Sequence, residues 1–438
     1  MAKIQAQILK GFRDYLPQDM IPREEMIDKV KEVFQKYGYS PLETPALEYQ
    51  ETLCGKYGDE GEKQLYKFED NGKRKVGLRF DLTVPLARVM ATNQNEISLP
   101  FKRYQIQNVY RAEKPQKGRY REFYQCDVDC VGATSLVADA EYVLIASDLM
   151  KALGVNDFQV RLNNRQILNG FFEYSGIKEK DVRAVFMIID KKDKISPSEF
   201  NKELKSIGLS SEQIKKIVSF GKISGTNQEI LSELGKIFNK TNDGKVGLAE
   251  LTEVVGYLEA AKIPEKNYQI DLSIARGLEY YTGTVYETFL GGSAKDFGSV
   301  LSGGRYDKLI GMFMNQEIPA IGCSLGLDRL YAALVELKLV ANKIQTTAEI
   351  LVTVFDDSLK VKSFEVANQL RKSGKQVSLY PGDGNLGKQF KYADKLGIRY
   401  VIILGPDEVV QNKATLKDLT KNKQITVSMD QLDKELGI

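Results

Sequence analysis

Two short stretches of this sequence place charged, amide and aromatic side chains where they could bind a charged small molecule. In the first, Arg111 is followed by Gln125, Asp127 and Asp129, which alternate along an otherwise mostly apolar segment. Side chains at a period of two share one face of a strand, so these three polar groups should line a cleft or meet solvent. The second stretch, Arg276–Gly283, holds an arginine, a glutamate and two tyrosines. Such cations, carboxylates and hydroxyls suit nucleotidyl or phosphoryl chemistry, in which positioning and charge stabilisation dominate.

The chain contains no histidine. This absence excludes a Ser-His-Asp triad, a Cys-His dyad, an imidazole general base and a histidine-ligated metal. Catalysis must therefore come from carboxylates, arginines, hydroxyls and bound metal ions. Such a composition is awkward for most hydrolases and favours chemistry at phosphate groups.

Composition bounds the class of protein further. With 438 residues, 42% of them hydrophobic and 28% charged, the chain should form two or three globular domains. No apolar run reaches the roughly 20 residues that span a bilayer, and the N-terminus lacks a signal-peptide core, so we expect a cytoplasmic protein without membrane contact. Four dispersed cysteines favour a reducing compartment. Cys126 and Cys130 lack a second ligand pair, so we expect no metal held by protein side chains alone.

Residues 101–132 predict a long hairpin that carries the first stretch. Apolar and polar residues alternate on both arms, and the turn at Glu113–Tyr120 contains Pro115 and Gly118. The tip is basic, which suits polyphosphate or nucleic acid; a merely solvated charged tip is an equally good interpretation of these residues alone. Because the net charge is only +3, any RNA site must be a local patch.

The segment YRAEKPQKGRYREFYQCDVDCVG, residues 110–132, resembles motif 2 of the class II aminoacyl-tRNA synthetases in the form carried by histidyl-tRNA synthetases. Other stretches resemble the same family in the same order: GFRDYLP (11–17), GYSPLETPALE (38–48, motif 1), LRFDLTVP (78–85), RGLEYYTG (276–283) and IPAIGCSLGLDRL (318–330, motif 3). The resemblance covers about residues 8–438. Two side chains depart from the usual pattern, since Glu279 and Asp328 stand where the family commonly has Asp and Glu.

The resemblance implies an α/β fold class with an α+β catalytic core. That core is the class II antiparallel sheet with flanking helices, spanning residues 1–338 and interrupted by a helical insertion at about 165–263. A linker at 339–347 and a C-terminal mixed-sheet α/β anticodon-binding domain at 348–438 should follow; the alternating strand and helix patterns beyond residue 347 fit such a domain.

The implied function is that of a histidine–tRNA ligase, which activates L-histidine with ATP to histidyl-adenylate plus pyrophosphate and then transfers histidine to the 3′ end of tRNA(His). Arg111 and Arg276 are the implied catalytic residues, acting with Mg²⁺ on the charge that grows at the α-phosphate. Motif 1 implies a homodimer. Cofactor and partner expectations are therefore ATP, Mg²⁺, L-histidine, tRNA(His) and a second copy of the chain.

The implied binding residues form three groups. A carboxylate and a hydroxyl suit the substrate ammonium, Asp129 with Tyr281 can fix both ring nitrogens of imidazole, and Phe123 with Arg329 can sandwich adenine. The histidine-binding candidates are Asp81, Leu82, Thr83, Arg111, Gln125, Asp129, Arg276, Tyr280 and Tyr281. The ATP-binding candidates are Arg111, Glu113, Phe123 and Arg329. The tRNA-facing candidates are Lys114, Lys117, Arg119, Lys388, Gln389 and Lys391.

Other interpretations compete with this one. A catalytically inactive regulatory subunit, such as the histidine sensor of ATP phosphoribosyltransferase, resembles the catalytic core, but commonly lacks the Arg-Gly motif or the C-terminal domain. A synthetase for another amino acid disagrees with the Arg276–Gly283 motif. Residues 239–250 mimic an EF-hand loop, but position one is Asn and position three is Thr, so a turn between helices is the better interpretation.

Overall fold

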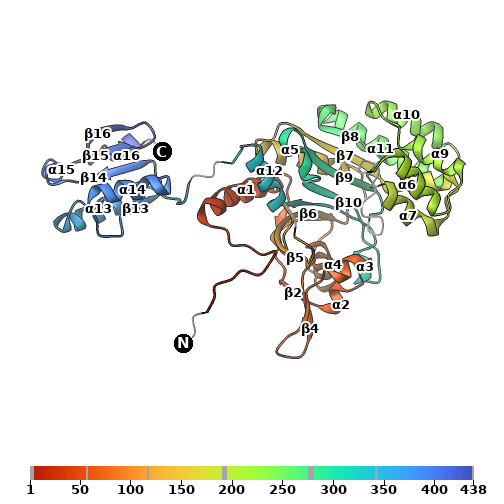
Figure 1. The fold of residues 1–438 in the computed structure, drawn as a ribbon, viewed down its shortest axis with the longest axis horizontal. Helices are drawn as coiled ribbons and strands as arrows, with labels where there is room; N and C mark the ends of the chain where they lie inside the picture. The colour runs from red at the N-terminus through yellow and green to blue at the C-terminus, as the bar shows by residue number, and fades with distance from the viewer. Residues whose placement is uncertain are drawn as a thin grey trace. The chain divides into compact units, whose positions relative to one another are not determined.

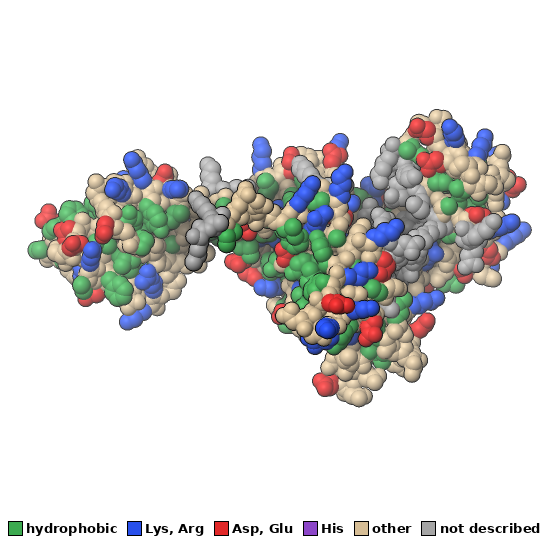
Figure 2. Space-filling model, turned by 60° about the horizontal axis from the view of Figure 1, so that its bottom comes forward, with side chains coloured by type: hydrophobic (Ala, Val, Ile, Leu, Met, Phe, Trp, Pro, Cys, Tyr) green, Lys and Arg blue, Asp and Glu red, His purple; other side chains and the backbone are tan. Residues whose placement is uncertain are grey.

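The computed structural model describes residues 4–55, 58–115, 118–189, 195–274, 281–340 and 344–436. The chain divides into two compact units (Figure 1). The first unit comprises Met1–Arg13 and Ile27–Leu339, and the second comprises Asp14–Met26 and Val340–Ile438. In Figure 2 the Lys and Arg side chains lie interspersed with Asp and Glu over the visible surface, as the small net charge leads one to expect.

An eight-stranded sheet forms the centre of the first unit, in the order β1-β5-β6-β11-β10-β9-β7-β8. All neighbours from β5 to β7 are antiparallel, whereas the edge strands β1 and β8 pair in parallel. The expected antiparallel core and the hairpin are confirmed. The strand bounds are β1 Ser40–Pro41, β5 Phe101–Tyr110, β6 Glu122–Val131, β7 Phe158–Asn164, β8 Tyr268–Ile270, β9 Thr284–Leu290, β10 Leu301–Arg305 and β11 Ala320–Gly326.

One face of this sheet is mostly apolar and is covered by α5 (Val137–Ala152), to which Arg305 of β10 is joined by a buried ion pair with Asp139. Tyr142 on α5 donates its hydroxyl to the backbone oxygen of Ile321 at 2.9 Å, and Tyr286 on β9 donates to the backbone oxygen of Asp139 at 3.0 Å. These bonds satisfy buried hydroxyls while the surrounding apolar side chains exclude water. The opposite face carries the side chains of Gln125, Asp127 and Asp129 and is called the polar face below.

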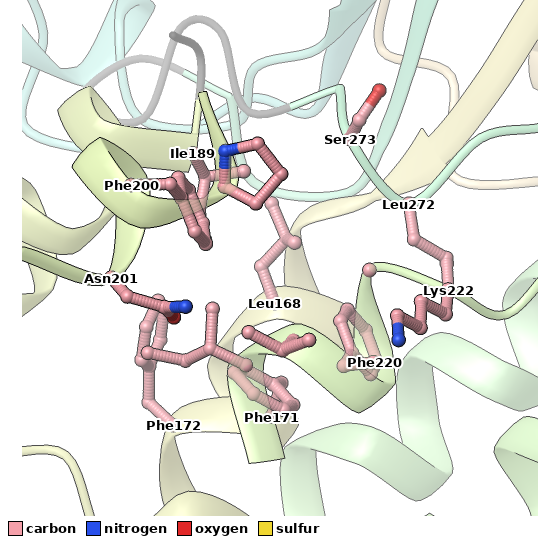
Figure 3. A pocket seen from close by; sticks show the side chains of 14 residues that line it. Leu168, Phe171, Phe172, Ile189, Phe200, Asn201, Phe220, Lys222, Leu272 and Ser273 are labelled. Carbon is pink, nitrogen blue, oxygen red and sulfur yellow. The ribbon is translucent and has the colours of Figure 1, made fainter. Parts of the chain in front are cut away.

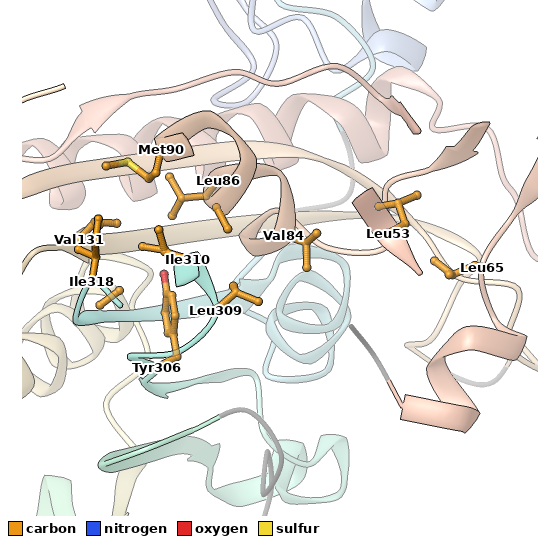
Figure 4. Packing of buried hydrophobic residues seen from close by; sticks show 12 residues of the cluster. Leu53, Leu65, Val84, Leu86, Met90, Val131, Tyr306, Leu309, Ile310 and Ile318 are labelled. Atoms are coloured by element: carbon orange, nitrogen blue, oxygen red, sulfur yellow. The ribbon is translucent and has the colours of Figure 1, made fainter. Parts of the chain in front are cut away.

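An apolar cluster covers one end of the polar face (Figure 4). It joins α4 (Thr83–Thr92) and the short helix η4 (Ile310–Met312) to the ends of β6 and β11. Each fully buried leucine or isoleucine in such a cluster contributes about 1.5–3 kcal/mol. The packing holds the N-terminal end of α4 beside the polar groups. The labelled members in Figure 4 are Leu53, Leu65, Val84, Leu86, Met90, Val131, Tyr306, Leu309, Ile310 and Ile318.

Helices make up most of the chain between β7 and β8. Three of them begin with reciprocal capping boxes, at Ser196, Ser210 and Thr226, which satisfy the first backbone donors. The EF-hand mimic does not form a loop of that kind, because Asn242 already begins α11. The helix bounds are α6 Arg165–Ser175, α7 Glu179–Ile189, α8 Pro197–Ser206, α9 Ser211–Phe220, α10 Asn227–Phe238 and α11 Asn242–Ala260.

Three local patterns in the sequence suggest elements that the structure does not have: a helix with Pro22 in its first turn, a strand over residues 78–85 and a hairpin over residues 270–287. The helix α1 (Pro17–Lys36) begins before Pro22, which lies inside it. LRFDLTVP is not one strand: β4 (Lys75–Leu78) ends as it starts, and Thr83 begins α4. Ile270–Glu287 is not a hairpin, because β7 lies between β8 and β9 in the sheet.

The remaining elements of the first unit flank the large sheet. A three-stranded sheet, in the order β2-β4-β3, precedes α4 in the sequence. Among the described residues no helix is long and apolar enough to span a bilayer. The bounds are β2 Leu47–Tyr49, α2 Gln50–Leu53, α3 Gly58–Lys63, β3 Lys67–Glu69 and α12 Leu327–Glu336, with the short helices η2 Glu265–Asn267 and η3 Gly292–Phe297.

The second unit contains a five-stranded mixed sheet in the order β13-β12-β14-β15-β16. The first three strands are parallel and the last two antiparallel, so the expected mixed sheet is confirmed. The strand β15 was not predicted, since its charged residues interrupt the apolar pattern. The bounds are β12 Ile350–Val352, η5 Asp357–Leu359, α13 Lys360–Lys372, β13 Val377–Leu379, α14 Leu386–Leu396, β14 Tyr400–Ile403, α15 Pro406–Val410, β15 Lys413–Asp418, β16 Lys423–Ser428 and α16 Leu432–Leu436.

Candidate active site

The polar face is organised in rows that run across β5, β6 and β11. Paired residues of antiparallel strands point to the same face, so each polar residue of β6 has a neighbour on either side. β11 contributes small residues at these positions, which leaves room above the sheet. The rows are Arg103–Asp129–Gly322, Gln105–Asp127–Ser324 and Gln107–Gln125–Gly326.

Asp129 is held from two sides. Nη2 of Arg103 lies 2.8 Å from Oδ2 of Asp129, and both side chains are buried. The Tyr306 hydroxyl donates to Oδ1. A Cβ at Gly322 would overlap the Asp129 carboxylate, so the glycine is needed for this arrangement. Neither Arg103 nor Tyr306 was a sequence candidate, because the register that brings them to Asp129 is set by sheet pairing.

Tyr281 lies close to the same carboxylates. A Cβ at Gly304 would come within 2.8 Å of the Tyr281 ring, which places the ring directly over β10. Burial raises the pKa of the Tyr281 hydroxyl, and the charges of Asp129 and Asp127 add to the effect. The structure therefore brings Tyr281 and Asp129 together. Arg276, Glu279 and Tyr280 lie outside the described residues.

The Asp81–Thr83 segment lies at the covered end of the polar face. Oδ1 of Asp81 accepts from the backbone N–H of Val84 at 3.0 Å, which caps α4. The backbone oxygen of Leu82 accepts from Arg103 at 3.2 Å. Burial raises the pKa of Asp129, and the Asp81 carboxylate raises it further, which shows that these charges belong to one cluster.

Arg111 lies where β5 ends and the turn of the hairpin begins, against two aromatic rings. Its Nε donates to the backbone oxygen of Phe80 at 3.1 Å, and its guanidinium carbon is 4.4 Å from the Phe80 ring centroid. The ring of Phe123 is 5.2 Å from the same carbon. Gln125 donates to the Ser324 hydroxyl at 2.9 Å, while its buried Oε1 has no hydrogen-bond partner among the described residues. Arg111 and Phe123 therefore lie together, and Gln125 on the polar face leaves an acceptor available to a ligand.

The N-terminal signature ties the hairpin to the motif 3 helix. Arg13 pairs with Asp328 on α12 at 2.5 Å, and the other Asp328 oxygen accepts from the backbone N–H of Tyr124 at 2.9 Å. The backbone oxygen of Gly11 accepts from the N–H of Arg121 at 2.9 Å. Asp328 thus positions β6 and the N-terminal segment, a structural role that its motif alone did not reveal.

The ATP-side candidates lie along this junction. Arg329 donates to the backbone oxygen of Ser299 at 2.7 Å, and a Cβ at Gly118 would lie 3.8 Å from the Arg329 side chain. The hairpin tip and α12 therefore approach each other. Oε2 of Glu113 lies 3.8 Å from Nη1 of Arg119. Lys114 and Arg119 are exposed, as an RNA-facing role requires, and Lys117 lies outside the described residues.

The three C-terminal RNA candidates separate into two kinds. Lys388 and Lys391 are exposed on α14. Gln389 is fully buried, and its amide bonds to both backbone groups of Val354, at 2.9 and 2.7 Å, and to the oxygen of Gly384 at 2.8 Å. The interpretation of Gln389 as an RNA-facing group is therefore corrected: an amide bonded in this way anchors the loop after β12. The helical period places it on the inner side of α14, whereas its polar type suggested the outer side.

A separate cavity of about 450 Å³ lies among α6, α7, α8 and α9 (Figure 3). Its walls are mainly apolar, with Phe171, Phe200 and Phe220 prominent and Lys222 the charged member. Such a lining offers few polar partners to a nucleotide or an amino acid. The polar face is therefore the better candidate for chemistry on charged substrates.

Comparison with known proteins identifies the family of this chain. The histidyl-tRNA synthetase family model matches residues 11–330, and an anticodon-binding domain model matches 349–437. The chain is 43% identical over 434 residues to the histidine–tRNA ligase of Clostridium tetani, with 98% of each chain covered. This chain belongs to the histidyl-tRNA synthetase family. The ligase of Rhodopirellula baltica is also 43% identical, over 96% of this chain and 95% of that one.

Solved structures agree with the family assignment. The crystal structure of a histidyl-tRNA synthetase from Nostoc sp. PCC 7120 has a TM-score of 0.91 at 36% identity and covers 99% of both chains. A Bacillus halodurans structure titled ATP phosphoribosyltransferase regulatory subunit/histidyl-tRNA synthetase has a TM-score of 0.75 at 24% identity, which shows a shared fold alone. The family and the fold expected from the motifs are confirmed, and the regulatory alternative gains no comparable support.

Proposed function

We propose that this chain activates L-histidine with ATP, releases pyrophosphate, and transfers the histidyl group to the 3′ end of tRNA(His). Membership of the histidyl-tRNA synthetase family supports the reaction. The observation that carries the substrate assignment is Asp129, which is held by Arg103 and Tyr306 beside Tyr281. A carboxylate fixed in this way accepts a hydrogen bond from a ring N–H with high selectivity. An analogue that lacks the N–H leaves the buried carboxylate without a donor and therefore binds much less tightly.

The substrate is held by groups from both ends of the polar face. Asp81 and Thr83 bind the ammonium, since a carboxylate and a hydroxyl both accept from N–H donors. Asp129 and Tyr281 hold the imidazole, one at each ring nitrogen. Gln125, whose Oε1 is unpartnered among the described residues, faces the substrate from the adjacent row.

In the first step a histidine carboxylate oxygen attacks the α-phosphorus of ATP and pyrophosphate leaves. Negative charge grows on the phosphoryl oxygens, and Arg111 and Arg276 offset it as preorganised cations. The ring of Phe123 and the guanidinium of Arg329 hold adenine between them. Arg111 is oriented by Phe80 before substrate arrives, so it need not reorganise during the reaction.

Mg²⁺ enters with ATP in this proposal. The described residues contain no group of three or more Asp, Glu or Cys side chains that could hold a metal ion, and the chain has no histidine. This donor set fits an ion carried by phosphate oxygens better than a resident protein site. When bound, Mg²⁺ neutralises phosphate charge and polarises the reacting phosphoryl group.

In the second step the terminal ribose hydroxyl of tRNA attacks the adenylate carbonyl carbon, and AMP leaves. No imidazole base exists in this chain, so a phosphate oxygen of the substrate accepts the hydroxyl proton. Lys114, Lys117 and Arg119 at the hairpin tip contact the RNA backbone, and Lys388 and Lys391 do so from α14. We further propose that the protein is a cytoplasmic homodimer. Each chain has a catalytic domain at residues 1–338 with an insertion at about 165–263, a linker at 339–347 and an anticodon-binding domain at 348–438.

The test is ATP–pyrophosphate exchange measured with each of the twenty amino acids. Exchange with histidine alone, followed by charging of tRNA(His), supports the proposal. Exchange with another amino acid keeps the fold and discards the specificity. Folded protein that binds histidine but catalyses no exchange favours a regulatory subunit.

A further inference from the structure

Asp127 is a buried carboxylate that the mechanism above does not use. It lies between Gln125 and Asp129 on the same face of β6 and is 2% exposed. Its Oδ1 accepts no hydrogen bond from the described residues. A buried carboxylate oxygen without a donor is costly, and such a group in a binding site suggests that a ligand supplies the donor.

The charges on the polar face around Asp127 do not balance. Arg103 is fully buried and lies 2.8 Å from Asp129, with a further hydrogen bond to Gln105 at 3.2 Å. One guanidinium thus faces two carboxylates, so the Arg103–Asp127–Asp129 group carries one negative charge when both are ionised. Burial raises the pKa of Asp127 to about 7, with Arg103 opposing the shift and Asp129 adding to it. The polar face can therefore accept one positive charge or one proton beside these carboxylates.

The other groups near Asp127 do not neutralise this negative charge. The hydroxyl of Tyr306 is already directed at Asp129, and the Ser324 hydroxyl favours the ionised form of Asp127. Nothing among the described residues adds a second cation to the pair. The groups that act on Asp127 or Asp129 from the polar face include Arg103 from β5, Asp81 before α4, Tyr281 and Tyr306. Cys130, Cys323 and Tyr142 act on them from the other side of the sheet.

We propose that Asp127 is a second specificity-determining residue, and that the polar face holds histidine as the imidazolium. One ring N–H donates to Asp129, and the other donates to Oδ1 of Asp127 beside the Tyr281 hydroxyl. The proposal rests on the function proposed above. An imidazolium has two N–H donors and no acceptor, which matches carboxylates that only accept. It also brings the single positive charge that Arg103 leaves unmatched.

The first experiment compares histidine with 1,2,4-triazol-3-ylalanine, a near-isosteric analogue whose ring stays neutral at neutral pH. The measured quantity is the ratio of kcat/KM values in ATP–pyrophosphate exchange. Asp127→Asn should lower the preference for histidine at least about tenfold, which corresponds to ~1.4 kcal/mol. Asp148→Asn on α5 is the matched control, since it makes the same chemical change away from the polar face.

A second measurement uses the unmodified chain and does not depend on how the variant folds. Calorimetric titration with histidine in buffers of different ionisation enthalpy counts the protons taken up. At pH 8 the free imidazole is neutral, because its unperturbed pKa is about 6.5, so binding should take up more than about half a proton. Triazolylalanine carries the same ammonium and should take up much less.

The outcomes separate the two proposals. The role of Asp127 is overturned if folded Asp127→Asn keeps the same ratio of kcat/KM values for histidine over triazolylalanine. It is also overturned if histidine binding at pH 8 takes up no proton. In both cases the unmodified chain still catalyses exchange with histidine. Loss of histidine-dependent exchange in the unmodified chain would instead overturn the proposed function. A lowered preference together with proton uptake supports both.

Discussion

Arg13 and Asp328 are 315 residues apart in the sequence and form an ion pair at 2.5 Å. Asp328 is buried at the start of α12, whereas the Arg13 side chain is 30% exposed. The guanidinium carbon of Arg13 also lies 3.7 Å from the ring centroid of Tyr120 at the hairpin tip. One contact therefore joins the N-terminal signature, the hairpin and the motif 3 helix, the three segments that frame the proposed ATP side.

Breaking this contact should weaken ATP binding and leave histidine binding nearly unchanged. Because Arg13 is partly exposed and its charge is screened, we expect Arg13→Ala to raise the KM for ATP about five- to tenfold, or ~1 kcal/mol. Lys31→Ala, which removes an exposed pair with Asp28 on α1, is the control. Equal increases in the KM values for ATP and histidine would show that the contact serves the whole fold.

Substitutions of Asp129 and Tyr306 should raise the KM for histidine far more than the KM for ATP. Asp129→Ala removes the fixed carboxylate and should raise the KM for histidine at least about a hundredfold, because it also breaks the buried ion pair with Arg103. Tyr306→Phe removes one hydrogen bond to a charged acceptor, worth ~1.5–3 kcal/mol, and should raise the KM for histidine about ten- to a hundredfold. Steady-state exchange with each substrate varied in turn measures both. Losses of the same size for ATP would mean that Asp129 does not read the ring.

Gly322→Ala tests the space beneath the Asp129 carboxylate. The added methyl would overlap that carboxylate, so the KM for histidine should rise steeply while the strand pairing persists. Gly326→Ala is a matched change on the same face of β11, where a Cβ would meet no atom closer than 3.8 Å. Histidine KM in this second variant should stay within about twofold of the unmodified chain, as expected for ordinary van der Waals contact. Similar KM values for the two variants would argue against the overlap.

Arg276→Ala should abolish adenylate formation while leaving the proposed dimer intact. The residue lies outside the described residues, and its role is proposed from the family motif and from the charge that develops at the α-phosphate. Pyrophosphate exchange measures the loss, and sedimentation with thermal unfolding checks assembly and folding. Near-normal exchange in this variant would remove Arg276 from the mechanism.

The stability of the ligand-free chain should depend on pH through Asp127. Its pKa is raised by burial from 3.8 to about 7 in the folded state, so the folded state binds more protons than the unfolded state between these values. The free energy of unfolding should therefore fall as pH rises through that window. Asp127→Asn should flatten this dependence and raise Tm at pH 8 more than at pH 5. A variant with the same pH slope as the unmodified chain would contradict the shift.

Much of the architecture followed from local patterns. The alternation along residues 101–132 predicted the β5–β6 hairpin, and the alternating segments beyond residue 347 fitted the mixed sheet. These patterns are local because the period of the side chains is set by the backbone geometry of each element. The motif order was enough to assign the family, which the comparisons confirmed.

Tertiary structure decided which groups surround the proposed substrate. Sequence alone identified Asp129 and Tyr281, but pairing across β5 brought Arg103 beneath Asp129, and the course of β10 brought Tyr306 to it. The local sequence likewise did not predict that β7 lies between β8 and β9 in the sheet, or that Gln389 is buried. Register, strand order and burial depend on contacts between residues far apart in the chain, whereas periodicity and motif chemistry depend on neighbours. The sequence by itself therefore determined the chemistry available, and the folded sheet determined which charges meet.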